Sequence, residues 1–302
     1  MEISKRPRMD YDDVPLDLST KKNSTNERKN EETDLIRSNK LSDNDIFVVP
    51  KVPPQSISIS DKLLASECAL SQKLRYINFN FPVEYVYNPI EYAFQVHAMY
   101  VTKYCRSTKK ILFLGMNPGP WGMSQTGVPF GEVNIVRDWL KIFGHIGKPI
   151  REQADRLITG FKCTRSEISG RRFWNLFREL CNGDPEKFFK HAFLHNYCPI
   201  ALMDAGGRNI TPAELKGPEQ YTLYSACDET LVSVLKLLKV EIVLGVGRFA
   251  EKRAQTVIKT TGLPIKVLCI PHPSPRSVGN ENWNEKAKLK LREYNLMEYF
   301  AN

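Results

Sequence analysis

The chain of 302 residues lacks the features that mark zinc-stapled, disulfide-rich and membrane-spanning proteins. Its seven cysteines are odd in number and contain no Cys-x-x-Cys pair, which argues against a zinc finger, a cysteine-ligated cluster and a disulfide framework. No apolar run approaches the ~18 residues that a transmembrane helix needs, and no secretory segment opens the sequence. We therefore expect free, mostly buried cysteines in a reducing compartment, with no metal, no cofactor and no membrane association.

Residues 1–60 are short of the hydrophobic side chains that a core requires. Tyr11 and Phe47 are their only aromatic residues, while Ser, Asn, Asp, Glu and Lys are abundant. Such a segment cannot bury enough apolar surface to offset the entropy lost on folding. We predict a disordered tail over residues 1–60 and one folded domain over residues 61–302.

Two short segments of this tail have the composition of recognition motifs. The basic run Lys5–Arg8 is typical of a nuclear import signal, so a nuclear location is expected. Pro15–Ser19 resembles the Pro-x-Asp-Leu-Ser peptide that C-terminal-binding-protein corepressors recognise, and an extended segment of this kind suits addition to a groove in a partner. Matches of four or five residues also arise by chance.

The excess positive charge belongs to the predicted folded domain. The whole chain carries a net charge of +9, and residues 1–60 hold 10 basic and 11 acidic side chains. Residues 61–302 therefore hold 33 basic and 23 acidic side chains. Such a balance is typical of a domain that binds a polyanion, with nucleic acid as the first candidate. A merely basic soluble protein has the same composition, and charge says little about specificity.

Four apolar runs with the composition of buried strands alternate with amphipathic segments in residues 61–302. Strongly apolar strands that alternate with helices favour a parallel sheet covered on both faces. We predict an α/β fold of three layers, α/β/α, around a central, mainly parallel four-stranded sheet. The strands are expected at residues 110–114, 192–195, 240–244 and 265–270. Helices are expected at residues 61–74, 88–105, 132–143, 169–181, 184–191, 219–238, 248–260 and 282–296, with a short one opening at 211–214.

A short polar motif follows each of the four predicted strands. In an open α/β sheet, ligands bind beyond the carboxyl ends of the strands, so these motifs should surround one crevice. Each has a purely structural reading as well: a Gly-x-Asn-Pro-Gly-Pro turn, a capping asparagine, a Gly-x-Gly turn and a loop histidine. Their shared position favours a site for a polar, hydrogen-bonding substrate. The residues concerned are Asn117, Asn196, Gly247 and His272.

Together, the motifs resemble those of the single-strand-selective monofunctional branch of the uracil-DNA glycosylase superfamily. The resemblance runs from about Leu63 to the end of the chain and does not include residues 1–60. Its most specific parts are Gly-Met-Asn-Pro-Gly-Pro-Trp-Gly at the start and His-Pro-Ser-Pro-Arg near the end. The matching stretches are residues 115–133, 169–174, 195–199, 207–215, 245–248 and 272–276.

The resemblance implies a role for each residue that would face the base. His272 would donate a hydrogen bond to O2 of the leaving uracil, and Asn117 would hold the attacking water. The backbone at Met116 and Gly119 would approach the base closely. Phe130 would stack on the flipped base and Asn196 would read its Watson–Crick edge.

The resemblance also implies how the chain would hold DNA. The residues after His272 would form a wedge that enters the duplex, although residues 277–282 depart from the family pattern and are one residue short. The implied activity removes uracil and 5-hydroxymethyluracil from single- and double-stranded DNA. It leaves an abasic site without strand cleavage, and a monomer is implied. The implied DNA-binding residues are Pro273, Ser274, Pro275, Arg276, Gly247 and Arg248.

Two other functions are compatible with parts of the sequence. A catalytically idle homologue could bind nucleic acid and recruit partners through Pro15–Ser19, but it would have no need of both Asn117 and His272. A different glycosylase branch would act on mismatched thymine or hypoxanthine and would release thymine from G·T pairs. Phe130, Asn196 and His272, in the register of the uracil family, argue against that branch.

Overall fold

The computed structural model describes residues 58–276 and 280–301. Residues 1–57 of the predicted tail, with both of its motifs, lie outside these residues. Its last three residues were wrongly assigned, because the first helix begins at Ile59 and Ser58 caps it. A four-stranded sheet occupies the centre, with the strand order β3-β2-β6-β7 and all neighbouring pairs parallel. The predicted sheet is therefore confirmed. Its strands are β2 (Ile111–Gly115), β3 (Ala192–Asn196), β6 (Ile242–Val246) and β7 (Lys266–Ile270).

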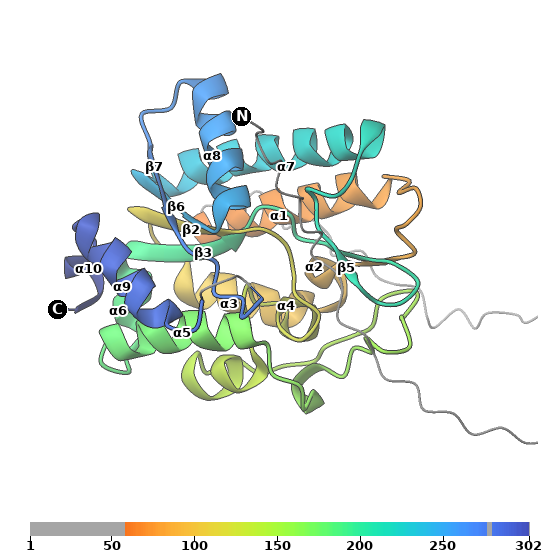
Figure 1. The fold of residues 1–302 in the computed structure, drawn as a ribbon, viewed down its shortest axis with the longest axis horizontal. Helices are drawn as coiled ribbons and strands as arrows, with labels where there is room; N and C mark the ends of the chain where they lie inside the picture. The colour runs from red at the N-terminus through yellow and green to blue at the C-terminus, as the bar shows by residue number, and fades with distance from the viewer. Residues whose placement is uncertain (1–57, 277–279, 302) are drawn as a thin grey trace, which may run out of the picture. The chain divides into compact units, whose positions relative to one another are not determined.

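Helices cover both faces of this sheet, as the unbroken apolar runs predict. Every residue of β2 and β3 is buried, whereas β7 is only partly covered at the far edge. Figure 1 shows one helical layer on each side of the sheet. One layer contains α1 (Ile59–Arg75), α7 (Gly217–Leu238) and α8 (Arg248–Thr261). The other contains α5 (Ile168–Leu180), α6 (Pro185–His191), α9 (Trp283–Glu293) and α10 (Glu298–Ala301).

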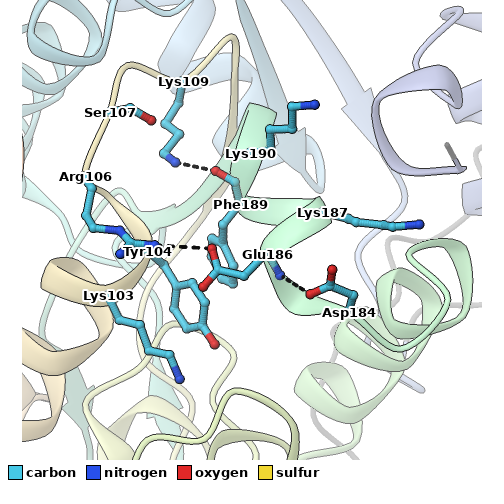
Figure 2. Close-up of a pocket in the computed structure, with 10 residues that line it drawn as sticks. All are labelled: Lys103, Tyr104, Arg106, Ser107, Lys109, Asp184, Glu186, Lys187, Phe189 and Lys190. Carbon is cyan, nitrogen blue, oxygen red and sulfur yellow. Dashed lines mark hydrogen bonds and ion pairs between the residues drawn. The ribbon is translucent and has the colours of Figure 1, made fainter.

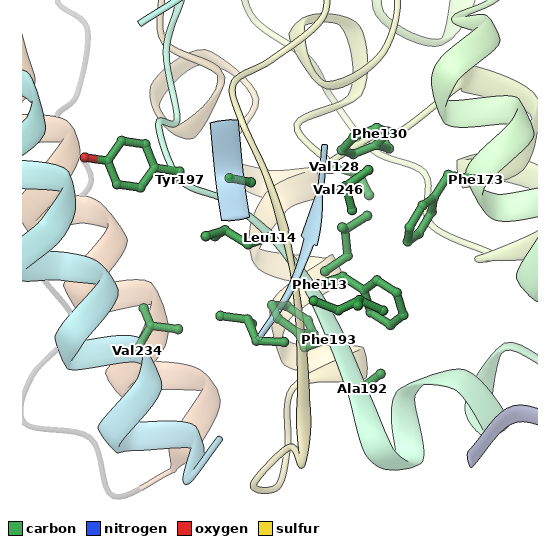
Figure 3. Packing of buried hydrophobic residues seen from close by; sticks show 14 of the residues in the cluster. Phe113, Leu114, Val128, Phe130, Phe173, Ala192, Phe193, Tyr197, Val234 and Val246 are labelled. Atoms are coloured by element: carbon green, nitrogen blue, oxygen red, sulfur yellow. The ribbon is translucent and has the colours of Figure 1, made fainter. Parts of the chain in front are cut away.

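Phe113 of β2 lies at the centre of the core on the α5 side. Its side chain is fully buried. Figure 3 shows Phe113 among the buried hydrophobic residues, together with Phe173. Large aromatic side chains supply most of the apolar area here, and their tilted and edge-to-face contacts are the geometry that aromatic rings prefer. Four rings lie 5.0–6.0 Å from it, those of Phe173, Phe177, Phe188 and Phe300.

One long helix was predicted over residues 88–105, and the structure divides it. Helix α2 spans Pro89–Tyr92 and α3 spans Phe94–Tyr104, with a break at Ala93. Asn88 does not cap α2 with its side chain, because its amide donates to Ser71 Oγ on α1 at 2.7 Å. A tertiary hydrogen bond thus replaces the local cap that the Asn-Pro pair predicts.

Two further helix predictions were wrong in extent. Residues 132–143 form only a short helical segment that includes the π-helix Ile135–Trp139. The apolar face expected of an amphipathic helix is nevertheless buried, with Val133, Val136, Trp139 and Leu140. Residues 211–214 form a turn rather than the start of a helix, and α7 begins at Gly217. The Glu214 carboxylate still accepts hydrogen bonds from the Thr211 amide and hydroxyl. Only one half of a capping box is therefore formed, since the Glu214 amide donates to the Thr211 carbonyl rather than to its hydroxyl, and the contact closes a turn.

A second sheet was not predicted. It has the antiparallel order β1-β4-β5, with β1 at Tyr85–Tyr87, β4 at Ala201–Met203 and β5 at Asn209–Ile210. Strands of two or three residues show no alternation of apolar and polar side chains, so the sequence carries no signal for them. This sheet places Asn209 near the loop that follows β2.

All seven cysteines lie within the described residues as free thiols. Five of them are buried, which confirms the prediction that most would be. None of the helices within residues 58–276 and 280–301 is long and apolar enough to cross a membrane.

Replacing Phe113 with Ala should lower the free energy of unfolding by about 3–5 kcal/mol, because it removes a fully buried ring and leaves a cavity among its aromatic neighbours. Urea denaturation of both proteins measures the difference. Tyr76→Ala is the control, since its side chain is 83% exposed and its loss should change stability by less than about 0.5 kcal/mol. A loss below about 1 kcal/mol for Phe113→Ala would contradict this account of the core.

Candidate active site

The four polar motifs meet at one edge of the central sheet, because the strands that precede them run parallel. Asn117 follows β2 and Asn196 ends β3. Gly247 follows β6 and His272 lies two residues beyond β7. The structure therefore brings these four predicted residues to the carboxyl edge, where α/β proteins bind their ligands.

Gly115, at the end of β2, leaves room for the side chains of two neighbours. A Cβ atom placed on Gly115 would lie 2.2 Å from Asn196 Oδ1 and 2.7 Å from Phe130 Cε2. Any other residue would collide with both side chains. The amide of Asn196 and the ring of Phe130 thus share one small volume above the sheet.

The Asn196 amide is buried without a full set of hydrogen bonds. Its Nδ2 lies 3.2 Å from Met123 Sδ, a weak acceptor, and its buried Oδ1 has no hydrogen-bond partner among the described residues. An unpaired buried polar atom costs about 1–3 kcal/mol. Unpaired buried polar atoms are retained at functional sites, because a ligand supplies the missing hydrogen-bond partner.

Phe130 adopts a left-handed backbone conformation, with φ of 53°. Bulky residues rarely adopt it, and strain of this kind persists where the surrounding structure imposes it. The amide of Gly131 donates to the Val128 carbonyl at 2.8 Å, and the Thr126 hydroxyl donates to the Gly131 carbonyl at 2.9 Å. The ring centroid lies 5.8 Å from that of His272, so the two rings border one space.

His272 is placed to act as a neutral hydrogen-bond donor. Its Nδ1 accepts a hydrogen bond from the Ser274 amide at 3.1 Å, so the ring proton belongs on Nε2. Burial lowers the pKa of His272 to about 4, so the ring carries no charge near neutral pH. Gly247, with φ of 93°, permits close approach, because a Cβ there would lie 3.1 Å from the Cβ of His272.

Three further residues hold the His272 turn, and one of them, Asn280, lies in the segment for which a DNA wedge was predicted. Asn280 donates from Nδ2 to the carbonyls of His272 and Ser274, at 2.8 and 2.7 Å. Arg172 donates to the Pro273 carbonyl at 3.3 Å, and Trp283 donates from Nε1 to the Pro271 carbonyl at 2.8 Å. Arg172 belongs to the Ser-Gly-Arg-Arg-Phe-Trp stretch that carries the family resemblance, so the sequence did contain a signal for it.

The loop after β2 is pinned from both sides. The Met116 carbonyl accepts a hydrogen bond from the Cys198 amide at 2.9 Å. Asn117 Nδ2 lies 3.4 Å from Asn209 Oδ1 of the second sheet. Gly119 is overlain by a carboxyl group, since a Cβ there would lie 2.3 Å from Glu167 Oε2. Burial is the main cause that raises the pKa of Glu167 to about 7, and the negative charge of Glu132 adds to it.

Of the remaining predicted residues, Pro273 is buried and Ser274 is partly buried, whereas the others lie at the surface. Arg248 opens α8, is exposed and forms an ion pair with Glu251 at 2.7 Å. Pro275 and Arg276 are also exposed, and the Arg276 amide donates to Ser274 Oγ at 3.2 Å. Residues 277–279, which include part of the segment where the sequence departs from the family pattern, lie outside the described residues.

A basic pocket of about 350 Å³ lies elsewhere in the fold, beside the residues that precede β2 and β3. Figure 2 shows Lys187 and Lys190 pointing away from its centre. The Lys109 ammonium already donates to the Phe189 carbonyl. None of the predicted site residues lines this pocket, so it is not the candidate site.

The ring of His272 should stay neutral from pH 8 down to about pH 5. Histidine in an unfolded chain titrates near 6.5, so between pH 6.5 and 4 the unfolded state binds more protons. The contribution of His272 to stability therefore falls as the pH falls through that window. NMR titration of the ring nitrogens measures this, with the urea-unfolded protein as control. Titration near pH 6.5 in the folded protein would contradict the assignment.

Comparisons with known proteins agree with the geometry. The family model described as the Uracil DNA glycosylase superfamily matches residues 102–295. The single-strand selective monofunctional uracil DNA glycosylase of Bos taurus is 47% identical over 245 residues, which cover 81% of this chain and 90% of that protein. The Mus musculus protein of the same name is 46% identical, with coverage of 81% and 88%.

A solved structure supports the fold at much lower identity. The crystal structure of wild-type Pedobacter heparinus SMUG2 has a TM-score of 0.57 at 17% identity, and the match covers 80% of this chain and 99% of that one. This likeness concerns the fold alone. The family model and the sequence matches show that the chain belongs to the uracil-DNA glycosylase superfamily, among the single-strand-selective monofunctional uracil-DNA glycosylases.

Proposed function

We propose that the protein is a monofunctional DNA glycosylase that hydrolyses the N-glycosidic bond of uracil in DNA and leaves an abasic site. The observation that carries this proposal is the incompletely bonded Asn196 amide beside the rings of Phe130 and His272. An amide, a stacking surface and a neutral donor fit the edge, the face and the leaving oxygen of a pyrimidine. The names of the curated relatives support uracil as that pyrimidine.

Asn196 and Phe130 select and hold the base. The amide offers one acceptor and one donor, which match N3–H and O4 of uracil. Cytosine presents the opposite pattern at these positions, so both of its contacts would be unfavourable. The base reaches the pocket only after leaving the helical stack, and the Phe130 ring then stacks against it.

His272 stabilises the leaving base. Cleavage of the bond gives the sugar oxocarbenium character and puts negative charge on O2 of uracil. A fixed donor aimed at developing charge stabilises the transition state more than the ground state. Because the ring is neutral with its proton on Nε2, it donates a hydrogen bond without giving up a proton.

Asn117 positions the water that attacks the sugar. An amide cannot remove a proton from water, so it acts by orientation and not as a general base. The reaction therefore depends mainly on departure of the base, assisted by His272. No lysine belongs to the motifs around the crevice, as a glycosylase that leaves the strand uncut requires.

The finer specificity follows from the loop after β2. Met116 and Gly119 place their backbone against the base, and we assign the rejection of thymine to an ordered water near Gly119 that a methyl group cannot replace. A hydroxymethyl group can replace it, so 5-hydroxymethyluracil and related oxidised uracils are also substrates. Removal of these bases would initiate base excision repair.

The DNA lies across the carboxyl edge of the sheet, in single- or double-stranded form. Positive charge from Arg248 and Arg276 would pair with phosphates, and the turn they border would wedge into a duplex. A nuclear location, a monomeric state and corepressor recruitment through Pro15–Ser19 complete the proposal. The DNA-binding set comprises Pro273, Ser274, Pro275, Arg276, Gly247 and Arg248.

Base release from oligonucleotides that carry one uracil or one 5-hydroxymethyluracil tests the proposal. We expect release by the wild type and losses of about 10²–10³-fold in kcat for His272→Leu, because it removes a donor to the leaving oxygen. Asn117→Ala should also lose activity strongly, since the attacking water is no longer held. His191→Leu is the matched control, a histidine on α6 whose ring contacts Tyr299, and it should change the rate less than twofold.

Three outcomes would overturn this assignment. Absence of release with DNA binding retained would indicate an idle homologue. Release of thymine from G·T pairs would indicate another glycosylase branch. Equal activity of His272→Leu and the wild type would remove that residue from the catalytic machinery.

Replacing Asn196 with Asp should lower kcat/KM for uracil by about 10-fold or more, because the donor to O4 is lost and a buried carboxylate takes its place. The ratio of uracil to cytosine release should fall as well. Single-turnover assays on both oligonucleotides measure this, with the exposed Asn78→Asp as control. Unchanged uracil kinetics would show that Asn196 does not face the base.

A further inference from the structure

Glu67, near the middle of α1, is a buried carboxylate that bridges two histidines. Its Oε2 lies 2.8 Å from His97 Nε2, and its Oε1 lies 3.2 Å from His195 Nδ1. The three residues are 4%, 1% and 6% exposed. A buried cluster of this kind is expensive unless every member is paired, and none of its members has a part in the reaction proposed above.

The geometry fixes the charge of His97. Its Nδ1 lies 2.8 Å from the Gly127 carbonyl oxygen, and its Nε2 faces the Glu67 carboxylate. The carbonyl only accepts hydrogen bonds, and so does the Glu67 carboxylate, which stays ionised because the two histidines outweigh burial and lower its pKa to about 2. Both ring nitrogens must therefore donate. Only the imidazolium form has two donors, and His97 with Glu67 therefore forms a buried ion pair.

Each histidine leads to one of the residues that would hold the base. His195 directly precedes Asn196 on β3, and successive side chains of a strand point to opposite faces. His97 holds the carbonyl of Gly127, three residues before the strained Phe130. The space around Gly127 is tight, since a Cβ there would lie 2.9 Å from the Ala93 carbonyl oxygen.

We propose that Glu67 is a positioning residue for the base pocket. Its carboxylate holds His97 against the Phe130 turn and His195 behind Asn196. The inference rests on the proposed function, because it explains how the stacking ring and the amide keep their relative positions. The Phe130 ring and the Asn196 amide converge above Gly115 with almost no spare room. A small displacement of either one would misalign the base, and misplacement by about 1 Å can cost 10²-fold in rate.

The ion pair between Glu67 and His97 should be lost as the pH rises. Burial opposes ionisation of both partners, but the charge of His97 and hydrogen bonds from both histidines lower the pKa of Glu67 to about 2. Glu67 in turn raises the pKa of His97 against the effect of burial. The contribution of His97 is therefore fully present below its unfolded pKa and is lost as the pH rises through its raised folded value.

Two thiols and one phenol near Glu67 remain neutral. Burial raises the pKa of Cys68 to about 11 and that of Cys105 to about 12, and Glu67 adds to both effects. Burial also raises the pKa of Tyr100 well above its ordinary value. Alkaline loss of positioning should thus follow deprotonation of His97.

Single-turnover release of uracil by full-length Glu67→Gln, measured across pH, tests the inference. We expect a roughly 10- to 100-fold lower rate, with the alkaline limb of the pH profile moved to lower pH, because His97 loses its anionic partner. Glu91→Gln is the matched control. Glu91 accepts hydrogen bonds from Ser71 and Arg75 and contacts neither histidine, so its variant should keep the wild-type pH profile.

Nitrogen NMR of the His97 ring provides a readout that does not depend on activity. Both ring nitrogens should carry protons in the wild type at pH 7, and this measurement stands even if Glu67→Gln does not fold. A neutral His97 in the wild type would overturn the inference. So would a variant with a lower melting temperature but an unchanged rate and alkaline limb, which would indicate a merely structural role. Absence of uracil release by the wild type would instead refute the proposed function.

Discussion

Parallel pairing of β3, β2, β6 and β7 is the constraint on which the site depends. Because all four strands run the same way, each loop that leaves a carboxyl end arrives at the same edge. An amide from β3, a loop from β2, a glycine turn from β6 and an imidazole from β7 therefore meet although their positions in the chain are far apart. A reversed strand would carry its motif to the opposite edge and dismantle the site.

Burial alone does not set the charge of a histidine in this fold. His97 is buried and His272 is partly buried, yet their pKa values shift in opposite directions. His97 faces the Glu67 carboxylate and a carbonyl, which favour the charged ring. His272 faces a backbone amide and no carboxylate, so desolvation dominates and the ring stays neutral. One fold thus keeps one histidine charged and another neutral.

The sequence predicted the central sheet and most helices, because unbroken apolar runs and amphipathic spacing are local signals. Candidate residues such as Asn117 and His272 came from strand-end motifs and from the family resemblance. The Glu67 cluster could not be found in this way, since its partners lie 30 and more positions away on other elements. Likewise, Asn280 acts through backbone carbonyls of a turn, and no residue pattern announces such a contact.

The position of β7 has a consequence for how the protein would lose its chemistry. It pairs only with β6 and is the least covered strand of the central sheet, whereas β3, also at an edge, is fully buried. Partly exposed edge elements open locally at lower free energy than buried ones. Local opening of β7 would withdraw His272 while Asn196 stays in place. The roles proposed for Asn196 in recognition and for His272 in catalysis thus belong to parts of the fold with different resistance to unfolding, and on that proposal warming would stop the reaction before it unfolded the pocket.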